Sequence, residues 1–121
     1  MRDIKFRYRL KIMGFADEPF FYEMTLAFIE DRTNKAIFRN FTILSRDQFT
    51  GLKDKNDVEI YDGDILKTYH DGNKVVHFYR GAFCIDFENR DVGGVNSVPL
   101  KSLTTKNMEV IGNIHENPEL L

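Results

Sequence analysis

Turn-forming residue pairs recur roughly every ten positions in the second half of the chain, and this spacing limits the fold more than any other feature. The pairs are Asp62-Gly63, Asp71-Gly72, Arg80-Gly81 and Gly93-Gly94. The short runs between them are rich in β-branched and aromatic residues, which favour strands. Several short strands joined by such turns predict a mainly β fold, built as a small barrel or roll.

The opening segment, residues 4–12, alternates between apolar and basic side chains without a break. This pattern predicts a half-buried strand with two different faces. The apolar face consists of Ile4, Phe6, Tyr8, Leu10 and Ile12, and the cationic face of Lys5, Arg7, Arg9 and Lys11. The following residues, Gly14 to Pro19, include Gly, Asp, Glu and Pro, so we expect the strand to end in a loop.

The segment from Phe20 to Asp31 fits two kinds of structure. Apolar residues at every second position fit a strand, whereas Pro19 followed by apolar residues at helical spacing fits a short helix. The strand is favoured, and the helix would make the fold α+β. Arg32 to Lys35 is typical of a turn. Ala36 to Leu44 is β-rich but alternates imperfectly, which predicts a strand with a bulge or a break in register.

The segments after residue 64 are predicted from their turns. Asp71-Gly72 supplies the positive φ angles of a tight hairpin turn between a strand over residues 65–70 and a strand over 74–79. In the next strand Phe83, Ile85 and Phe87 share one face. The remaining segments are predicted to be that strand over 82–87, a connector over 99–103, a closing strand over 109–115 broken by Gly112, and a tail over 116–121.

Residues 48–67 combine turn chemistry with five acidic side chains. Gly51, Asp62 and Gly63 are predicted to form strand ends and turns, because Gly accepts positive φ and Asp accepts a backbone hydrogen bond. Val58 and Ile60 are predicted to share one face of a strand. A calcium-binding loop needs an oxygen ligand and a Gly where this segment has Val and Glu. We therefore expect solvated turn carboxylates at Asp54, Asp57, Glu59, Asp62 and Asp64.

Three parts of the chain resemble the YopX-like proteins, a family found mostly in bacteriophages and prophages. They are the basic alternating start at 2–7, Thr-Gly-Leu-Lys-Asp at 50–54 with Glu-Ile-Tyr and Gly-Asp-Ile following, and Val-Ile-Gly-Asn-Ile-His-Glu-Asn-Pro-Glu-Leu at 110–120. One departure is Asn56-Asp57, where the family usually has Asn-Gly. The resemblance implies an SH3-like barrel over 48–121, with an N-terminal β region over 1–47 packed on it as one compact unit. It also implies a location in the bacterial cytoplasm.

Composition narrows the classes of partner. The chain has 121 residues and a formal net charge of -2, so it lacks the overall positive field that drives non-specific binding to nucleic acid or anionic membranes. Cys84 is the single cysteine, and no leader or long apolar run is present. We therefore expect a cytoplasmic protein with no internal disulfide and no membrane contact.

Side chains that carry out chemistry are few and scattered. Cys84 has no basic neighbour in the sequence, so His70, His77 or His115 would have to lie beside it to form an activated nucleophile. His70 and His77 flank the Asp71-Gly72 turn, but two histidines without a third ligand make a weak case for zinc. No phosphate-binding loop, dinucleotide motif or nucleophile elbow occurs. The sequence therefore predicts a protein that is not an enzyme, without catalytic, metal or cofactor sites.

The candidate binding surface is the cationic face of the first strand, formed by Lys5, Arg7, Arg9 and Lys11. Basic side chains spaced roughly 6.8 Å apart along a strand suit phosphates or an acidic protein surface. A solvated face that protects a sheet edge is the structural alternative. The favoured function is a non-enzymatic accessory module that forms homo-oligomers or binds a phage or host protein. The alternative is a nucleic-acid-binding small β-barrel that uses the basic strand.

Overall fold

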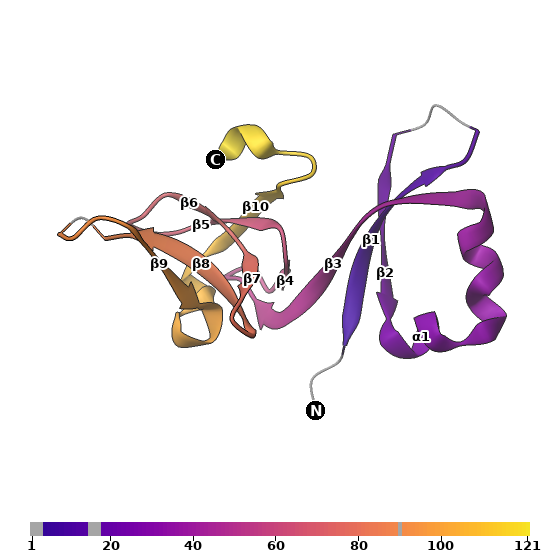
Figure 1. Ribbon diagram of the computed structural model, residues 1–121, viewed down its shortest axis with the longest axis horizontal. Coiled ribbons are helices and arrows are strands. Elements are labelled where there is room, and N and C mark those ends of the chain that lie inside the picture. Colours follow the sequence, from indigo (N-terminus) through magenta and orange to yellow (C-terminus); the bar gives the residue numbers. More distant parts are fainter. Residues whose placement is uncertain (1–3, 15–17, 90) are drawn as a thin grey trace. The chain divides into compact units, whose positions relative to one another are not determined.

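Antiparallel strands make up most of the regular structure in the computed structural model, which describes residues 4–14, 18–89 and 91–121 (Figure 1). The mainly β fold predicted from the sequence is confirmed. The chain divides into two compact units, Met1–Phe49 and Thr50–Leu121. Each unit has its own apolar core, so the two are described in turn. The packing of an N-terminal region on a C-terminal one stays a prediction.

The first unit contains three strands and two helical segments within the described residues. In chain order these are β1 (Lys5–Ile12), β2 (Phe20–Thr25), α1 (Leu26–Glu30), the 3-10 helix η1 (Arg32–Asn40) and β3 (Phe41–Lys53). The alternation predicted for the first strand is confirmed, since Tyr8 and Leu10 are buried and form a core with Met24. β1 pairs with both β2 and β3. It is therefore a central strand, and its basic face does not protect a sheet edge.

Helical segments replace part of the β structure that the sequence predicted for the first unit. The strand over β2 ends at Thr25, whose Oγ1 accepts a hydrogen bond from the Phe28 N–H at 3.2 Å and caps α1. The Asp31 carboxylate then accepts hydrogen bonds from both the N–H and the hydroxyl of Thr33 at the start of η1. These local contacts keep the chain helical, so the prediction of a strand over 36–40 is wrong. The predicted loop over 14–19 lies partly outside the described residues.

Within the described residues, the second unit contains seven further strands and three 3-10 helices. They are β4 (Glu59–Tyr61), β5 (Asp64–Lys67), β6 (Asn73–Val75), β7 (His77–Tyr79), β8 (Ala82–Glu88), β9 (Val95–Pro99), η2 (Leu100–Ser102), η3 (Thr105–Asn107), β10 (Glu109–Asn113) and η4 (Pro118–Leu120). Two antiparallel sheets have the orders β10-β5-β6 and β7-β8-β9, and β4 is hydrogen-bonded to β3. The described strands do not close into one barrel. The SH3-like barrel stays a prediction.

The core of the second unit lies between its strands. Ile85 shares a face with Phe83 and Phe87 as predicted, and all three contribute to this core. The expectation that Val58 and Ile60 share one face of a strand is wrong, because Ile60 is fully buried whereas Val58 is 45% exposed. Val58 precedes β4 and belongs to the turn. The buried core consists of Ile60, Leu66, Val76, Ile85, Leu100 and Met108.

The turns at two of the predicted turn-forming pairs differ in length. Tyr79 pairs with Ala82 across Arg80-Gly81, whose φ angles of +49° and +82° belong to a two-residue hairpin turn. The turn at Asp71-Gly72 is longer, since it begins at Thr68, whose N–H and hydroxyl both donate to the Gly72 carbonyl. The hydroxyl of Thr68 thus takes part in closing a loop that an Asp-Gly pair alone was expected to form.

Three features of the strands differ from those predicted. Gly51 has φ +87° but lies within β3 instead of at its end. The strand predicted over 74–79 is interrupted at Val76, whose N–H donates to the Asp64 carbonyl, and β6 and β7 belong to different sheets. β9 was not predicted, since the Asn, Ser and Pro within it weaken the β pattern.

The last residues fold back on the second unit, so the prediction of a plain tail over 116–121 is wrong. The Asn117 N–H donates to the Asn113 carbonyl at 2.8 Å, and the Asn73 side chain donates to the Leu120 carbonyl at 2.9 Å. The Asn117 side chain packs directly on Gly112, where the register of β10 shifts. The lack of a side chain at Gly112 therefore permits the chain to turn back.

We expect Gly112→Ala to destabilise the protein by about 1–2 kcal/mol. The added Cβ would lie 2.6 Å from Asn117 Oδ1 and 2.9 Å from Asn117 Cβ, so the whole side chain must shift. That shift breaks the hydrogen bond from the Asn113 N–H to Asn117 Oδ1. Urea unfolding measures the loss, and Asn117→Gly is the control. In that background Gly112→Ala should cost little more, and equal costs in both backgrounds would contradict the contact.

Candidate functional site

The four basic residues of β1 are all half-buried. Arg7 Nη2 lies 3.1 Å from Asp47 Oδ2 of β3, and the two side chains are only 13% and 8% exposed. An ion pair this well buried keeps its geometry better than one at the surface. Part of the cationic face predicted to bind a partner therefore already contacts a carboxylate of the same unit.

Aromatic rings share the cationic face of β1. The Lys5 ammonium lies 4.7 Å from the centre of the Phe49 ring, and the Arg7 guanidinium lies 4.7 Å from the centre of the Phe21 ring. Phe21 is the strand partner of Arg9, which places it on this face. Such cation–π contacts hold the basic side chains against the sheet. These contacts could not be predicted from the sequence of β1, because the rings come from β2 and β3.

Asp54 is fully buried, so the prediction of a solvated carboxylate is wrong there. Its Oδ1 accepts hydrogen bonds from the N–H groups of Asn56 and Val58 at 2.8 and 2.9 Å, and its Oδ2 accepts one from the Val110 N–H at 2.8 Å. Burial alone raises the pKa of Asp54, but the three backbone hydrogen bonds outweigh it and hold the pKa below its usual value. Asp54 thus joins the turn before β4 to β10.

Asp64 is also buried, and its prediction as a solvated carboxylate is likewise wrong. Its Oδ2 accepts a hydrogen bond from the Tyr61 N–H at 2.8 Å across the Asp62-Gly63 turn. Asp64 therefore supplies a carboxylate that accepts a backbone hydrogen bond in this turn, three positions after the donor Tyr61. Asp57 is exposed and Glu59 half-buried. The two buried carboxylates stabilise architecture and are not open to a ligand.

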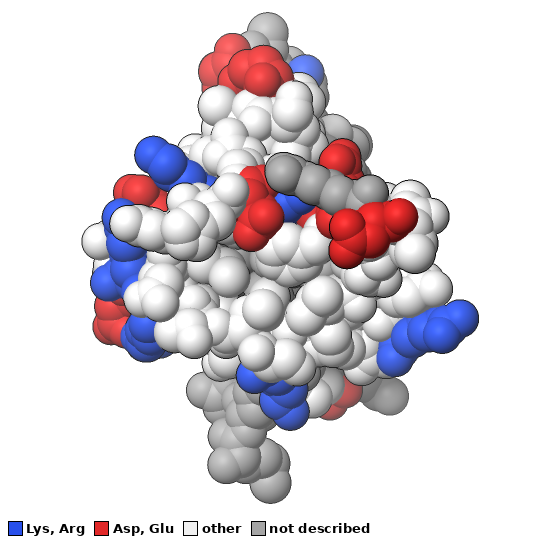
Figure 2. Space-filling view, turned by 90° about the vertical axis from the view of Figure 1, so that its left-hand side faces the viewer, with Lys and Arg blue, Asp and Glu red and all other residues white. Residues whose placement is uncertain are grey.

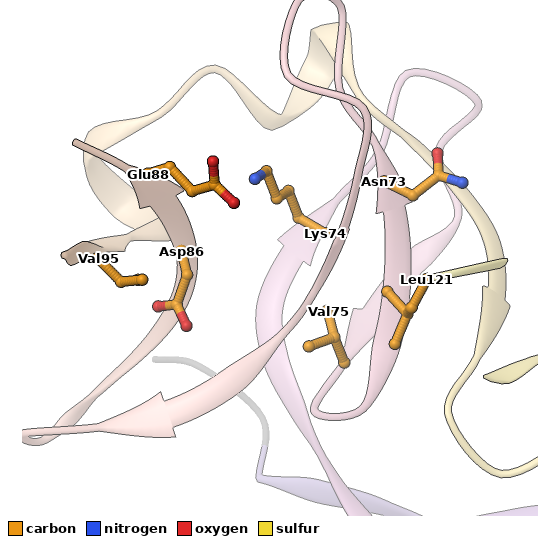
Figure 3. Close-up of a pocket in the computed structure, with 7 residues that line it drawn as sticks. All are labelled: Asn73, Lys74, Val75, Asp86, Glu88, Val95 and Leu121. Atoms are coloured by element: carbon orange, nitrogen blue, oxygen red, sulfur yellow. The ribbon is translucent and has the colours of Figure 1, made fainter. Parts of the chain in front are cut away.

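A cavity of about 230 Å3 lies between β6 and the neighbouring strands β8 and β9 (Figure 3). Lys74 and Glu88 point toward one another at its rim, and Asp86 lies below Glu88 on the same strand. A second cavity of about 200 Å3 shares Lys74 and Glu88 and adds His70 and Asp71. Both are smaller than the cavities of about 300–1,000 Å3 that usually hold substrates or cofactors.

His77, Asp86 and Ser97 form a hydrogen-bonded network beside the first cavity. His77 Nε2 lies 2.8 Å from Asp86 Oδ1, and the Ser97 hydroxyl donates to the same oxygen at 2.6 Å. The hydrogen bond from Ser97 holds the pKa of Asp86 below its usual value, against burial and with help from His77. Serine activation needs an imidazole next to the hydroxyl. Here the Ser97 hydroxyl contacts the Asp86 carboxylate and not the imidazole. The network therefore joins β7, β8 and β9 and does not activate the serine.

Cys84 has one histidine near it, since His77 is its strand partner. The thiol nevertheless points to backbone, with the Tyr79 and Ala82 carbonyls at 3.8 and 3.6 Å. Burial, and to a smaller extent the charge of Asp86, raises the pKa of the Cys84 thiol. Since the thiolate is the reactive form, this geometry opposes nucleophilic chemistry.

His70, the second histidine beside the Asp71-Gly72 turn, lies against an aromatic ring. His70 packs edge-on against Tyr69, with the ring centres 4.5 Å apart. Across the part of the chain that the structure describes, no three His, Cys, Asp or Glu side chains gather where they could hold a metal ion. None of the helices formed by the described residues is long and apolar enough to cross a membrane.

Exposed aromatic residues lie on two strands at sheet edges. β7 ends the sheet β7-β8-β9 and β2 ends the sheet that contains β1. Phe78 and Tyr79 of β7 are 58% and 45% exposed, and Phe20 and Tyr22 of β2 are also exposed.

Figure 2 shows the side of the molecule on which β8 and β9 lie in Figure 1. A broad area there has no charged side chains, and most charged side chains lie around it.

Comparisons with known proteins place the chain beside one family. The family model described as "YopX protein" matches residues 9–121. The crystal structure of protein EF1440 from Enterococcus faecalis is similar, with 26% sequence identity, a TM-score of 0.48, and coverage of 98% of this chain and 97% of that chain. None of the curated proteins compared with the chain matches it.

Proposed function

This chain belongs to the YopX family, and on that premise we propose that it is a non-enzymatic accessory protein of a bacteriophage or prophage. It acts in the cytoplasm of the bacterial host through protein contacts, and it assembles into homo-oligomers. The observation that carries this proposal is the exposure of aromatic side chains on sheet edges, above all Phe78 and Tyr79 on β7.

An edge strand offers backbone N–H and C=O groups that a second chain can pair with. Proteins that stay monomeric usually place lysine, proline or inward-facing charge on such edges. β7 has the sequence His-Phe-Tyr and carries no lysine, proline or acidic residue. Phe78 packs edge-on against Phe83 of β8, with ring centres 5.2 Å apart, and still leaves more than half of its surface exposed. Pairing with a second copy would cover that surface.

We expect light scattering on the purified protein at tens of micromolar to give a mass at least twice that of one chain. Phe78→Lys should lower the mass to that of a monomer, because a lysine on the edge opposes pairing. Tyr69→Lys is the matched control, since Tyr69 is 85% exposed but lies outside every described strand. A wild-type protein that is monomeric, or an equal effect of both substitutions, would contradict self-assembly through β7. Circular dichroism checks that both variants are folded.

Nucleic-acid binding by the basic strand is the second proposal, and it has weaker support. Arg7 pairs with Asp47, and Lys5 and Arg7 lie against aromatic rings. A phosphate would have to compete with these contacts. Binding to single- and double-stranded DNA at several salt concentrations, compared with the variant Arg7→Glu/Arg9→Glu, separates this proposal from the first.

A further inference from the structure

A groove in the second unit contains two lysines that the proposed function does not use. It has a volume of about 540 Å3 and lies between the end of β3 and the segment that contains η3. The residues that matter for its chemistry are Leu52, Lys53, Leu103, Thr104, Thr105 and Lys106. The groove is therefore lined by two lysines together with apolar and hydroxyl side chains, and the ammonium groups of these lysines lie beside Asp57, next to the groove.

Hydrogen bonds hold the two walls of this groove together. The Thr105 hydroxyl donates to the Lys53 carbonyl at 2.9 Å, and Thr105 itself is buried. The Lys55 N–H donates to the Met108 carbonyl, and the Met108 N–H donates to the Thr105 carbonyl, both at 2.9 Å. The lysine side chains thus start from backbone that is fixed, as a preorganised binding site requires.

One carboxylate lies between the two ammonium groups. Lys53 Nζ is 3.7 Å from Asp57 Oδ2, and Lys106 Nζ is 3.5 Å from Asp57 Oδ1. The Asp57 side chain is 73% exposed, so both ion pairs are weak and open to competition. The nearby carboxylate of Asp54 is buried, and both of its oxygens accept backbone hydrogen bonds. Asp57 is therefore the carboxylate that an incoming anion would replace.

The backbone of Asp57 supports this role. Its φ angle is +64°, in the left-handed region that glycine adopts more readily than any other residue. A residue with a side chain is held here in a conformation of higher energy, and its carboxylate lies where two lysines converge.

We propose that this groove binds an acidic segment of a partner protein and that Asp57 is its internal competitor. The inference rests on the proposed function, in that the chain acts through protein contacts. A glutamate or aspartate of the partner would lie between Lys53 and Lys106, and an adjacent apolar side chain would contact Leu52 and Leu103. The described lining contains no aromatic residue, whereas single-stranded nucleic acids are usually bound by stacking on aromatic rings. A peptide is therefore favoured over nucleic acid.

To test this, a capped hexapeptide of alternating Glu and Leu is added stepwise to the full chain. Binding is detected by NMR as shifts of the backbone amide signals. We expect shifts at residues 51–53 and 103–106, and weaker binding as salt is raised. Lys53→Gln/Lys106→Gln should weaken binding at least about fivefold, since two charge-assisted contacts are lost. Asp57→Asn should strengthen it about threefold, since the competitor loses its charge. Lys101→Gln, which removes an exposed lysine outside the groove, should change nothing.

Several outcomes would overturn the proposal. The same peptide with Gln in place of Glu could bind equally well, Asp57→Asn could weaken binding, or the lysine substitutions could have no effect. Tighter binding of a single-stranded oligonucleotide at the same residues would assign the groove to nucleic acid instead. Light scattering separates this result from the proposed self-assembly, because Phe78→Lys leaves the groove intact. An oligomer that fails to bind the peptide contradicts only the groove.

Discussion

Replacing Asp54 with alanine is expected to lower the free energy of unfolding by about 3–5 kcal/mol. The substitution leaves three backbone N–H groups, those of Asn56, Val58 and Val110, without their carboxylate acceptor at a site with no solvent exposure. An unsatisfied buried donor costs about 1–3 kcal/mol, and hydrogen bonds to a charged acceptor are stronger than neutral ones. The loss is a large part of the total stability of a small protein, about 5–15 kcal/mol.

Urea unfolding followed by circular dichroism measures this effect. Asp71→Ala is the matched control, because Asp71 is also a turn aspartate but is exposed. We expect the control to change stability by no more than about 0.5 kcal/mol. Asp54→Asn keeps the shape and one acceptor oxygen, so its cost should lie between those of the other two. A loss below about 1 kcal/mol for Asp54→Ala would contradict the structural role assigned to it.

The same carboxylate predicts how stability depends on pH. The pKa of Asp54 is lower in the folded protein than its unfolded value of about 3.9. Its contribution is therefore complete above the unfolded pKa and is lost as the pH falls through the folded pKa. The pKa of Asp86 is lowered in the same direction. We expect the wild type to lose stability below about pH 4, and the Asp54→Asn variant to lose less over that range.

Replacing Ile60 with alanine is expected to cost about 3–4 kcal/mol. Ile60 is fully buried in the core of the second unit, where the side chain packs with those of Leu66 and Ile85. The sequence predicted that Val58 shares its face, but Val58 is exposed. Val58→Ala should therefore cost less than about 1 kcal/mol. Urea unfolding of both variants distinguishes the two arrangements, and similar costs for both would favour the arrangement predicted from the sequence.

The sequence predicted the strands and turns that are determined by residues close to one another in the chain. The alternation of β1 and the turn at Arg80-Gly81 are local patterns, and both appear in the structure. The helix α1 matches the alternative that the sequence left open over residues 20–31, whereas the 3-10 helix η1 before β3 was missed, although its signals are local too. Thr25 caps α1 and Asp31 caps the following turn, and these contacts outweigh the β-propensity of the residues that follow.

The burial of Asp54 could not have been predicted from its neighbours. Its third hydrogen-bond donor is Val110, which lies 56 positions further along the chain. In the same way, Arg7 meets an aspartate 40 positions away. Charge alone predicts an exposed side chain in both cases. The groove was missed because Lys53 and Lys106 come together only when η3 lies beside the end of β3.

The hydrogen bond from the Val110 N–H to Asp54 also determines when the second unit can finish folding during synthesis of the chain. Residues 54–58 leave the ribosome long before residue 110, and their buried carboxylate needs an N–H that has not yet been made. Contacts between such distant residues form late and slow down folding. The second unit therefore reaches its final state only after β10 has been translated.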